Sequence, residues 1–176
     1  MKKVSNIIGL PVICIHTGNQ IGIVKDIACD PESNVYGLIL EPKTLFNEGK
    51  VIPLQEIKSI GDDAITVYVE NITQTMDELE KEHDELRGLY NARKLRGNKI
   101  ITTNGKELGI MEDVYFHEEL GTILGYELSE GIVADITEGR KYLPKPESIT
   151  EGEDVLIVPM SSEKNIEDWG ENKEDS

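Results

Sequence analysis

Two stretches, "GNQIGIVKDI" at Gly18–Ile27 and "GKELGIMEDV" at Gly105–Val114, repeat one pattern of glycine, apolar residues and aspartate. In each stretch a glycine comes first, a second glycine follows an apolar residue, and an aspartate precedes the last apolar residue. Folds use glycine in tight turns and apolar residues in the core. The repetition therefore predicts that the chain contains the same small structure twice.

Further matches follow in the same order, separated by small insertions of the kind that loops of duplicated domains accumulate. The matching glycine, aspartate and proline positions are Gly18, Gly22, Asp26, Gly37 and Pro53 in the first copy and Gly105, Gly109, Asp113, Gly125 and Pro144 in the second. We expect these residues to fix turns and strand contacts. For the two aspartates a hydrogen bond to the local backbone is the favoured interpretation. The alternatives are a pairing with a lysine such as Lys25 and two equivalent contact points.

Each copy consists of short segments rich in Ile, Val and Tyr that alternate with turn residues. Asp30-Pro31 is typical of a type I turn, and Asn104-Gly105 is typical of a type I′ hairpin. About five strands at this spacing predict a mainly β fold, with a small antiparallel barrel or sandwich in each copy. Lys25 and Glu112 interrupt the apolar face at the same place in both copies, which a β-bulge or an open barrel rim would explain.

The segment between the copies has the pattern of a helix. Its apolar residues Met76, Leu79, Leu86 and Tyr90 follow helical spacing, and Thr75–Glu78 fits a capping box. We expect a helix of about four to five turns. Its apolar stripe is expected to pack on one or both barrels, and pairing with a second copy of the chain in a homodimer is the alternative.

These patterns divide the chain into four parts. Residues 1–70 are the first barrel, 71–93 a helical linker, 94–160 the second barrel, and 161–176 an acidic disordered tail.

The composition argues against several functional classes. The formal net charge is −16, from 34 acidic and 18 basic residues, and such a charge repels nucleic acid. The chain has no apolar run of the ~18 residues that a membrane-spanning helix needs, and its start lacks the pattern of a secretory signal. We therefore expect a cytoplasmic protein without membrane insertion.

Residues that commonly carry chemistry are few and scattered. His16, His83 and His117 lie far apart in the sequence and lack metal-ligand spacing. Cys14 and Cys29 align with large hydrophobic residues in the second copy, which indicates buried thiols. No catalytic residue, metal site or cofactor is predicted.

Basic residues gather after the predicted helix, in a patch formed by Arg87, Arg93, Lys94, Arg96 and Lys99. The favoured interpretation is a solvated helix end whose cations complement the helix dipole. The alternative is a contact patch for a ribosomal or other anionic partner.

The order of these motifs resembles the PRC-barrel family. The residues that carry the resemblance are Gly9, Gly18, Gly22, Asp26, Gly37, Pro53, Asp63 and Val67 in the first copy and Gly97, Gly105, Gly109, Asp113, Gly125, Pro144, Asp154 and Val158 in the second. The resemblance covers residues 5–70 and 94–160. It implies a six-stranded, barrel-like fold in each half and no common catalytic chemistry. Related barrels occur in the photosynthetic reaction-centre H subunit, in a ribosome-maturation factor and in stand-alone tandem proteins of bacteria.

A tandem of two barrels offers two surfaces, which suits a scaffold. The predicted function is that of a non-enzymatic adaptor that binds other proteins. A ribosome- or RNA-processing-associated assembly factor is the first alternative. A small-molecule or metal-binding regulator is the second.

Overall fold

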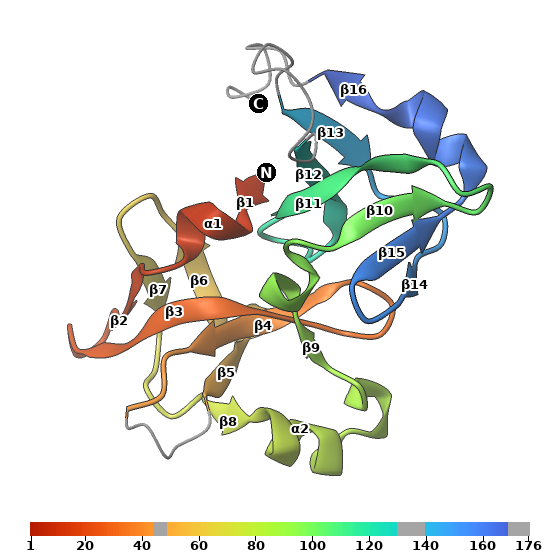
Figure 1. The fold of residues 1–176 in the computed structure, drawn as a ribbon. Helices are drawn as coiled ribbons and strands as arrows, with labels where there is room; N and C mark the ends of the chain where they lie inside the picture. The colour runs from red at the N-terminus through yellow and green to blue at the C-terminus, as the bar shows by residue number, and fades with distance from the viewer. Residues whose placement is uncertain (44–48, 130–139, 169–176) are drawn as a thin grey trace. The chain divides into compact units, whose positions relative to one another are not determined.

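The computed structural model describes residues 1–43, 49–129 and 140–168, and it divides the chain into two compact units (Figure 1). The first unit comprises Lys2–Lys94 with Phe116–Ile123. The second comprises Leu95–Tyr115 with the residues from Leu124 onward. The prediction of a mainly β protein with two domains is confirmed.

Strands dominate both units. In the first half of the chain they are β1 (Lys2–Lys3), β2 (Pro11–Cys14), β3 (Gln20–Cys29), β4 (Val35–Leu40), β5 (Lys50–Pro53), β6 (Ile57–Ile60), β7 (Ile65–Val67), β8 (Gln74–Thr75) and β9 (Tyr90–Asn91). In the second half they are β10 (Lys99–Thr102), β11 (Glu107–Phe116), β12 (Ile123–Ser129), β13 (Lys141–Pro144), β14 (Thr150–Glu151), β15 (Val155–Val158) and β16 (Glu167–Asp168).

The few helices are short. They are the α-helices α1 (Val4–Ile7) and α2 (Met76–Glu82) and the 3₁₀ turns η1 (Leu54–Glu56), η2 (Asp84–Leu86), η3 (Ala92–Leu95) and η4 (Met160–Asn165).

The two sheets have the same strand order. The first runs β6-β7-β2-β3-β4-β5-β8, and the second runs β14-β15-β10-β11-β12-β13-β16. Each strand of the first sheet thus has a counterpart at the same place in the second, as the repeated sequence predicts. The resemblance implied six strands in each half, and the ordered path extends beyond these to β8 and β16.

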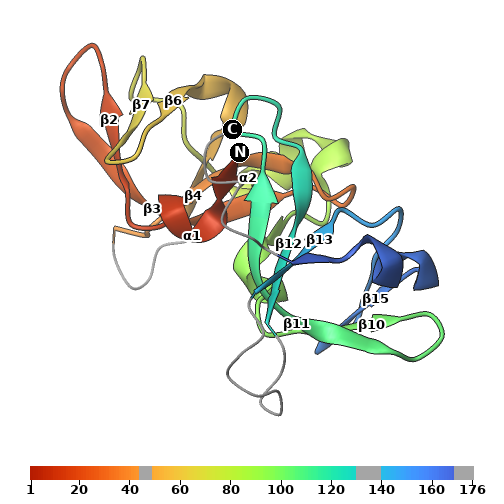
Figure 2. The same cartoon turned by 90° about the horizontal axis from the view of Figure 1, so that it is seen from above.

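One pair of strands in each unit is parallel, contrary to the expectation of a purely antiparallel barrel. Strand β2 pairs with β7 in parallel, with Val12 opposite Ile65, and β10 pairs with β15 in the same way, with Ile100 opposite Leu156. Figure 2 shows β2, β7 and β6 together at one end of the first unit. Among the described residues no ladder joins β6 to β8 or β14 to β16, so hydrogen bonds do not close either barrel.

The predicted bulge is present in the first unit. Val24 pairs with Leu40 and Asp26 pairs with Ile39, which leaves Lys25 as an extra residue on β3. A bulge lets Lys25 lie on the exposed side of a strand whose next four residues are buried.

The matched glycines and prolines face each other across neighbouring strands. Gly37 lies opposite Pro53, and Gly125 lies opposite Pro144. A β-carbon at Gly37 would meet the carbonyl oxygen of Ile52, and one at Gly125 would meet that of Leu143. Both glycines are therefore required because the backbone of the next strand comes too close for a side chain.

The turn at Asn104-Gly105 differs from the predicted type. Gly105 has a φ of +85°, but Asn104 does not share a positive φ, so the turn is not type I′. The amide of Gly105 donates to Thr102 O, and Thr102 N donates to Lys106 O, both at 2.8 Å. This is the three-residue hairpin loop in which glycine takes the left-handed position. The predicted turn at Asp30-Pro31 is confirmed by the hydrogen bond from Ser33 N to Asp30 O.

The helix between the copies is much shorter than predicted. It begins with the expected capping box, formed by Thr75 and Glu78, but it ends at Glu82. His83 is extended, and the chain continues as η2 and then as β9. Such a short helix has little stability of its own, so contacts with the sheet decide its length.

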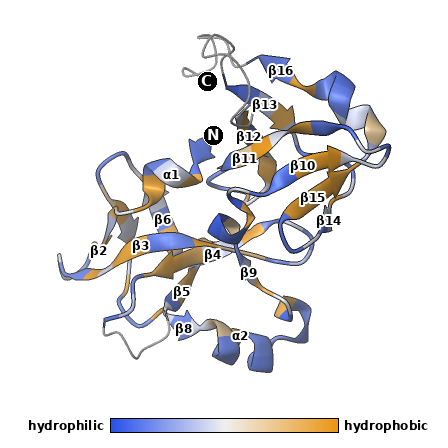
Figure 3. Ribbon diagram, in the orientation of Figure 1, coloured by the Kyte–Doolittle hydropathy of each residue, from blue (hydrophilic) through white to orange (hydrophobic). Residues whose placement is uncertain are grey.

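The apolar residues of this segment pack on the first sheet, as the favoured interpretation stated. Leu79, Leu86 and Leu89 form a buried cluster with Ala28, Ile39 and Val51 of strands β3, β4 and β5. Figure 3 shows hydrophilic colour over most of α2, so the few apolar residues that it has are the ones that reach the sheet. The segment after the helix adds Leu86 and Leu89 to the cluster that Leu79 joins.

The predicted disordered tail is ordered at its start. Residues 160–165 form η4, and β16 pairs with β13, with Lys141 opposite Asp168. The start of the tail is ordered because β16 forms a backbone ladder with β13, and the composition of the tail does not reveal this ladder. The remainder of the predicted tail, residues 169–176, lies outside the described residues.

We predict that Leu79→Ala destabilises the first unit. Leu79 is fully buried, and truncating such a leucine removes apolar contacts and leaves a cavity. The expected loss is about 2–5 kcal/mol in the free energy of unfolding, measured by urea denaturation. Lys81→Ala on the exposed side of α2 is the control, with an expected change below about 0.5 kcal/mol. Equal effects of the two changes would contradict this account of the packing.

Candidate functional site

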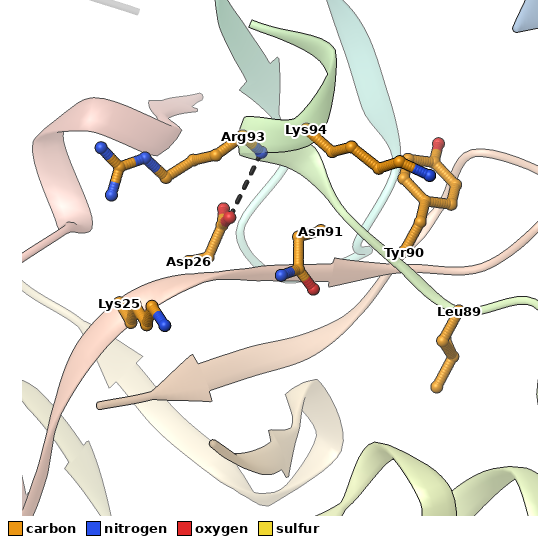
Figure 4. A pocket seen from close by; sticks show the side chains of 7 residues that line it. All are labelled: Lys25, Asp26, Leu89, Tyr90, Asn91, Arg93 and Lys94. Carbon is orange, nitrogen blue, oxygen red and sulfur yellow. Dashed lines mark hydrogen bonds between the residues drawn. The ribbon is translucent and has the colours of Figure 1, made fainter. Parts of the chain in front are cut away.

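A pocket of about 520 Å³ lies on the first unit, where β9 and η3 meet β3. Strand β9 pairs with β3 through Ala28–Asn91 and Cys29–Tyr90, which places the following turn η3 beside the bulge at Lys25. The lining residues, drawn in Figure 4, are Lys25, Asp26, Leu89, Tyr90, Asn91, Arg93 and Lys94. We call this the η3 pocket.

Asp26 is the buried polar residue of this pocket, with 3% of its surface exposed. Its Oδ1 accepts the amide of Ile27 at 2.8 Å, and its Oδ2 accepts the amide of Arg93 at 3.3 Å. Figure 4 shows the second bond joining β3 to η3. The carboxylate therefore satisfies backbone donors from two distant parts of the chain and holds η3 against the bulge.

Asp113 makes the equivalent local bond in the second copy. Its Oδ1 accepts the amide of Val114 at 2.8 Å. The two repeated aspartates thus share one backbone interaction at one place in the fold, which supports the structural interpretation of both.

Burial raises the pKa of Asp26 above its usual value near 3.8. The desolvation of the carboxylate is the largest cause, and it outweighs the opposing hydrogen bonds from Ile27 and Arg93. In the folded protein this group holds its proton to a higher pH than it does in the unfolded chain.

The predicted basic patch divides into two sets. Three of its members form ion pairs with nearby carboxylates: Arg87 with Asp84 at 2.8 Å, Arg96 with Glu112 at 3.5 Å and Lys99 with Glu107 at 3.2 Å. Arg93 and Lys94 line the η3 pocket. Lys25, which the sequence analysis did not select for this patch, joins them there. The equivalent of Lys25 in the second copy is Glu112. This reversal of charge at a repeated position is the sequence feature that could have drawn attention to Lys25.

A second surface feature lies where the parallel strands β2 and β7 end. The side chains of Ile15, Tyr68 and Val69 are each nearly half exposed, Tyr68 at 48%. The amide of Ile15 donates to Val67 O at 2.8 Å, and the thiol of Cys14 donates to Tyr68 O at 3.1 Å. We call Ile15, Tyr68 and Val69 the Tyr68 patch.

Polar groups surround this patch. The ring of His16 lies 5.8 Å from that of Tyr68, and the ammonium of Lys58 lies 5.9 Å from the Tyr68 ring centre. Glu70 accepts hydrogen bonds from Thr17 and Asn19, which ties the β2–β3 turn to the segment after β7. The apolar side chains therefore have an ordered polar border.

The remaining histidines and the cysteines lie in separate surroundings. His83 follows α2 with its Nδ1 at 3.4 Å from Glu85, and the Nδ1 of His117 accepts the amides of Glu119 and Leu120 in a turn. Both cysteines are buried thiols outside any disulfide, which confirms that prediction. In the described ranges no three His, Cys, Asp or Glu side chains gather closely enough to hold a metal ion.

Sequence reasoning missed a buried carboxylate in the second unit. Glu127 is 2% exposed, accepts the hydroxyl of Tyr115 at 2.7 Å and pairs with Arg140 at 2.6 Å. The equivalent residue in the first copy is the apolar Ile39, inside the cluster that α2 covers. A charge at a repeated core position could have indicated this network.

We predict that Asp26→Asn changes how stability depends on pH. Because the folded pKa of Asp26 is raised, its stabilising contribution is complete below the unfolded pKa and is lost as the pH rises through the folded pKa. The stability of the natural protein relative to Asp26→Asn should therefore increase as the pH is lowered from neutral toward the unfolded pKa near 3.8, measured by urea unfolding at each pH. A difference that stays constant with pH would contradict this.

Asp26→Ala tests the structural role of the same carboxylate at neutral pH. It removes the acceptor of two backbone amides, and an unsatisfied buried donor costs about 1–3 kcal/mol. We expect Asp26→Ala to lose about that much in free energy of unfolding. An unchanged stability would show that the hydrogen bonds to Ile27 and Arg93 contribute nothing.

No helix in the described parts of the chain has the length and the apolar content to cross a membrane. A comparison with curated proteins finds the uncharacterized protein YrrD of Bacillus subtilis (strain 168), which is 27% identical over 144 residues, 81% of this chain and 78% of the relative. The model of the PRC-barrel domain matches residues 1–70 and 87–165. These matches agree with the two equivalent sheets, and the chain belongs to the PRC-barrel family, with two such regions in tandem.

Proposed function

We propose that this protein is a non-enzymatic adaptor that binds another protein through the Tyr68 patch. The observation that carries the proposal is the exposure of the apolar residues Ile15, Tyr68 and Val69, which directly follow the two strands of one parallel pair. Tyrosine is among the residues that dominate binding energy at protein interfaces, and a polar border excludes water from such an anchor. His16, Lys58 and Glu70 supply that border here.

The second unit has exposed apolar residues at the equivalent end. Ile157 of β15 and Met160 of η4, the latter 58% exposed, lie where β15 ends beside β10. By the repeat, Met160 takes the place of Val69. Two apolar surfaces of different composition on one chain support a bivalent adaptor. Once the first surface has bound, the second binds at a high effective concentration, which raises the overall affinity.

The charge of the protein favours one kind of partner. A formal net charge of −16 attracts a protein whose binding surface carries basic residues around an apolar centre. The opposite charges would raise the association rate of such a partner, and the burial of Tyr68 would raise its affinity.

We predict that a photo-reactive amino acid at position 68 crosslinks a discrete partner in cells, and that the same amino acid at position 81 does not. With the identified partner in hand, Tyr68→Ser should weaken binding by about thirtyfold, since an interface anchor contributes about 2 kcal/mol or more. Because Tyr68 is half exposed, thermal unfolding should confirm that the variant folds.

Two outcomes would count against the adaptor. Equal crosslinking from positions 68 and 81 would show that the patch is not an interface. Crosslinking that disappears on nuclease treatment, with ribosomal proteins as the products, would favour the alternative role as a ribosome-associated assembly factor.

A further inference from the structure

We propose that the two PRC-barrel regions unfold as one cooperative system, because strands β11 and β12 of the second region extend into the first unit. The matched regions are residues 1–70 and 87–165, and they do not coincide with the two compact units. The first unit also contains residues 87–94 and 116–123 of the second region. This proposal concerns folding and does not depend on the adaptor function.

Residues 87–94 are built into the first sheet and its buried cluster. Strand β9 pairs with β3, and Leu89 lies in the cluster beneath α2. The hydroxyl of Tyr90 donates to Ser33 Oγ at 3.2 Å, and the Asp26 carboxylate accepts an amide of η3 at 3.3 Å. These contacts can persist while the second sheet is unfolded, because the segment precedes β10. The coupling of the two sheets therefore has to come from residues further along the chain.

The turn between β11 and β12 is the second attachment, and it lies against strand β4 and the turn η1. The amide of the buried Val35 donates to Gly121 O at 2.6 Å, and Asn34 forms an isolated β-bridge with Thr122. A β-carbon at Gly121 would lie 2.6 Å from Val35 O and 3.0 Å from Leu54 Cδ2. The turn thus packs on the first unit at backbone distance, and its departure would deprive the Val35 amide of this acceptor.

The strands that carry this turn are shared by both units. Strand β11 ends at Phe116 and β12 begins at Ile123, and both of these residues are buried and belong to the first unit. The earlier part of β11 and the later part of β12 belong to the second unit. The amide of His117 donates to Thr122 O at 2.9 Å, which closes the turn on the paired strands. The shape of the turn therefore depends on the pairing of β11 with β12.

Unfolding of either sheet would damage the other. If the second sheet unfolds, β11 and β12 no longer hold the turn in shape, because a two-stranded hairpin alone is at best marginally stable in water. If the first unit unfolds, Phe116 and Ile123 at the ends of the same strands lose their buried surroundings. The net stability of a domain is a small difference between large opposing terms, so losses of this kind are sufficient to merge the two transitions.

Cooperative unfolding has a consequence for binding. A ligand that binds only the folded state stabilises the whole cooperative system. A partner on one unit would therefore protect both units from unfolding, which two independent barrels joined by a linker would not show.

The test is a urea titration of the isotope-labelled full chain, in which native amide resonances report on each sheet. Ile27 and Leu38 report on the first sheet, and Met111 and Leu128 report on the second; all four residues are buried. We expect all four resonances to be lost at one common midpoint, since separate probes of a single cooperative unit give coincident transitions. Leu156→Ala, which truncates a buried residue of β15, should lower the midpoints of both sheets by about 1 M or more.

Two insertions of Gly-Gly separate the role of the turn from the effect of a longer loop. Between Glu119 and Leu120, the insertion still lets β11 pair with β12 but releases the turn from Val35. We expect two transitions in this variant, with the first sheet unfolding at the lower urea concentration. Between Asn104 and Gly105, in the β10–β11 turn of the second unit, the same insertion should leave one common transition.

Several results would overturn the proposal. They are different midpoints for the two sheets in the natural protein, a Leu156→Ala variant in which only the second sheet moves, and a single transition that survives the insertion before Leu120. Two transitions in the control insertion would assign the effect to loop length and would also overturn it. Should Leu156→Ala not fold, Ile100→Val removes one methyl group from the neighbouring strand β10 and should lower both midpoints by a smaller, equal amount.

Discussion

The parallel ladder between two short strands near the opposite ends of each repeat organises the structure. It joins β2 to β7 and β10 to β15, segments that are separated by most of one repeat. Because parallel strands end on the same side, Ile15 and Tyr68 directly follow the first ladder at neighbouring positions. The residues that precede them, Cys14 and Val67, are paired and buried. The ladder therefore buries the core of the unit and at the same time places its apolar surface residues.

The repeated aspartate connects the strand bulge with the segment that crosses it. In the first unit the Asp26 carboxylate accepts amides from β3 and from η3, at the cost of desolvating a charge. Together with the pairing of β9 with β3, this carboxylate holds η3 beside the bulged Lys25. The η3 pocket is thus a consequence of how the fold satisfies its backbone donors.

The two copies have kept one strand order and changed the faces of their sheets. In the first unit Ile39 and Val51 are apolar and are covered by Leu79 of α2. At the equivalent places the second unit has Glu127 and Tyr142, with Glu127 bonded to Tyr115 and Arg140. A duplicated domain preserves its ladders because every strand depends on them. One face of a sheet can replace apolar packing with a polar network, provided that each buried polar group forms a hydrogen bond. This divergence gives the two units different surfaces.

The sequence by itself determined the duplication, the mainly β class, the interruption of the apolar face at Lys25 and the capping box of α2, because these depend on local patterns of glycine, apolar residues and caps. It also indicated that Arg93 and Lys94 lie together, since they are neighbours in the chain. Only the tertiary structure decided that Lys25 joins them, that Ile15 meets Tyr68, that the helix ends at Glu82 and that residues near 168 form a strand. Each of these depends on a ladder or a packing contact between residues far apart in the chain, and a local pattern does not specify its distant partner.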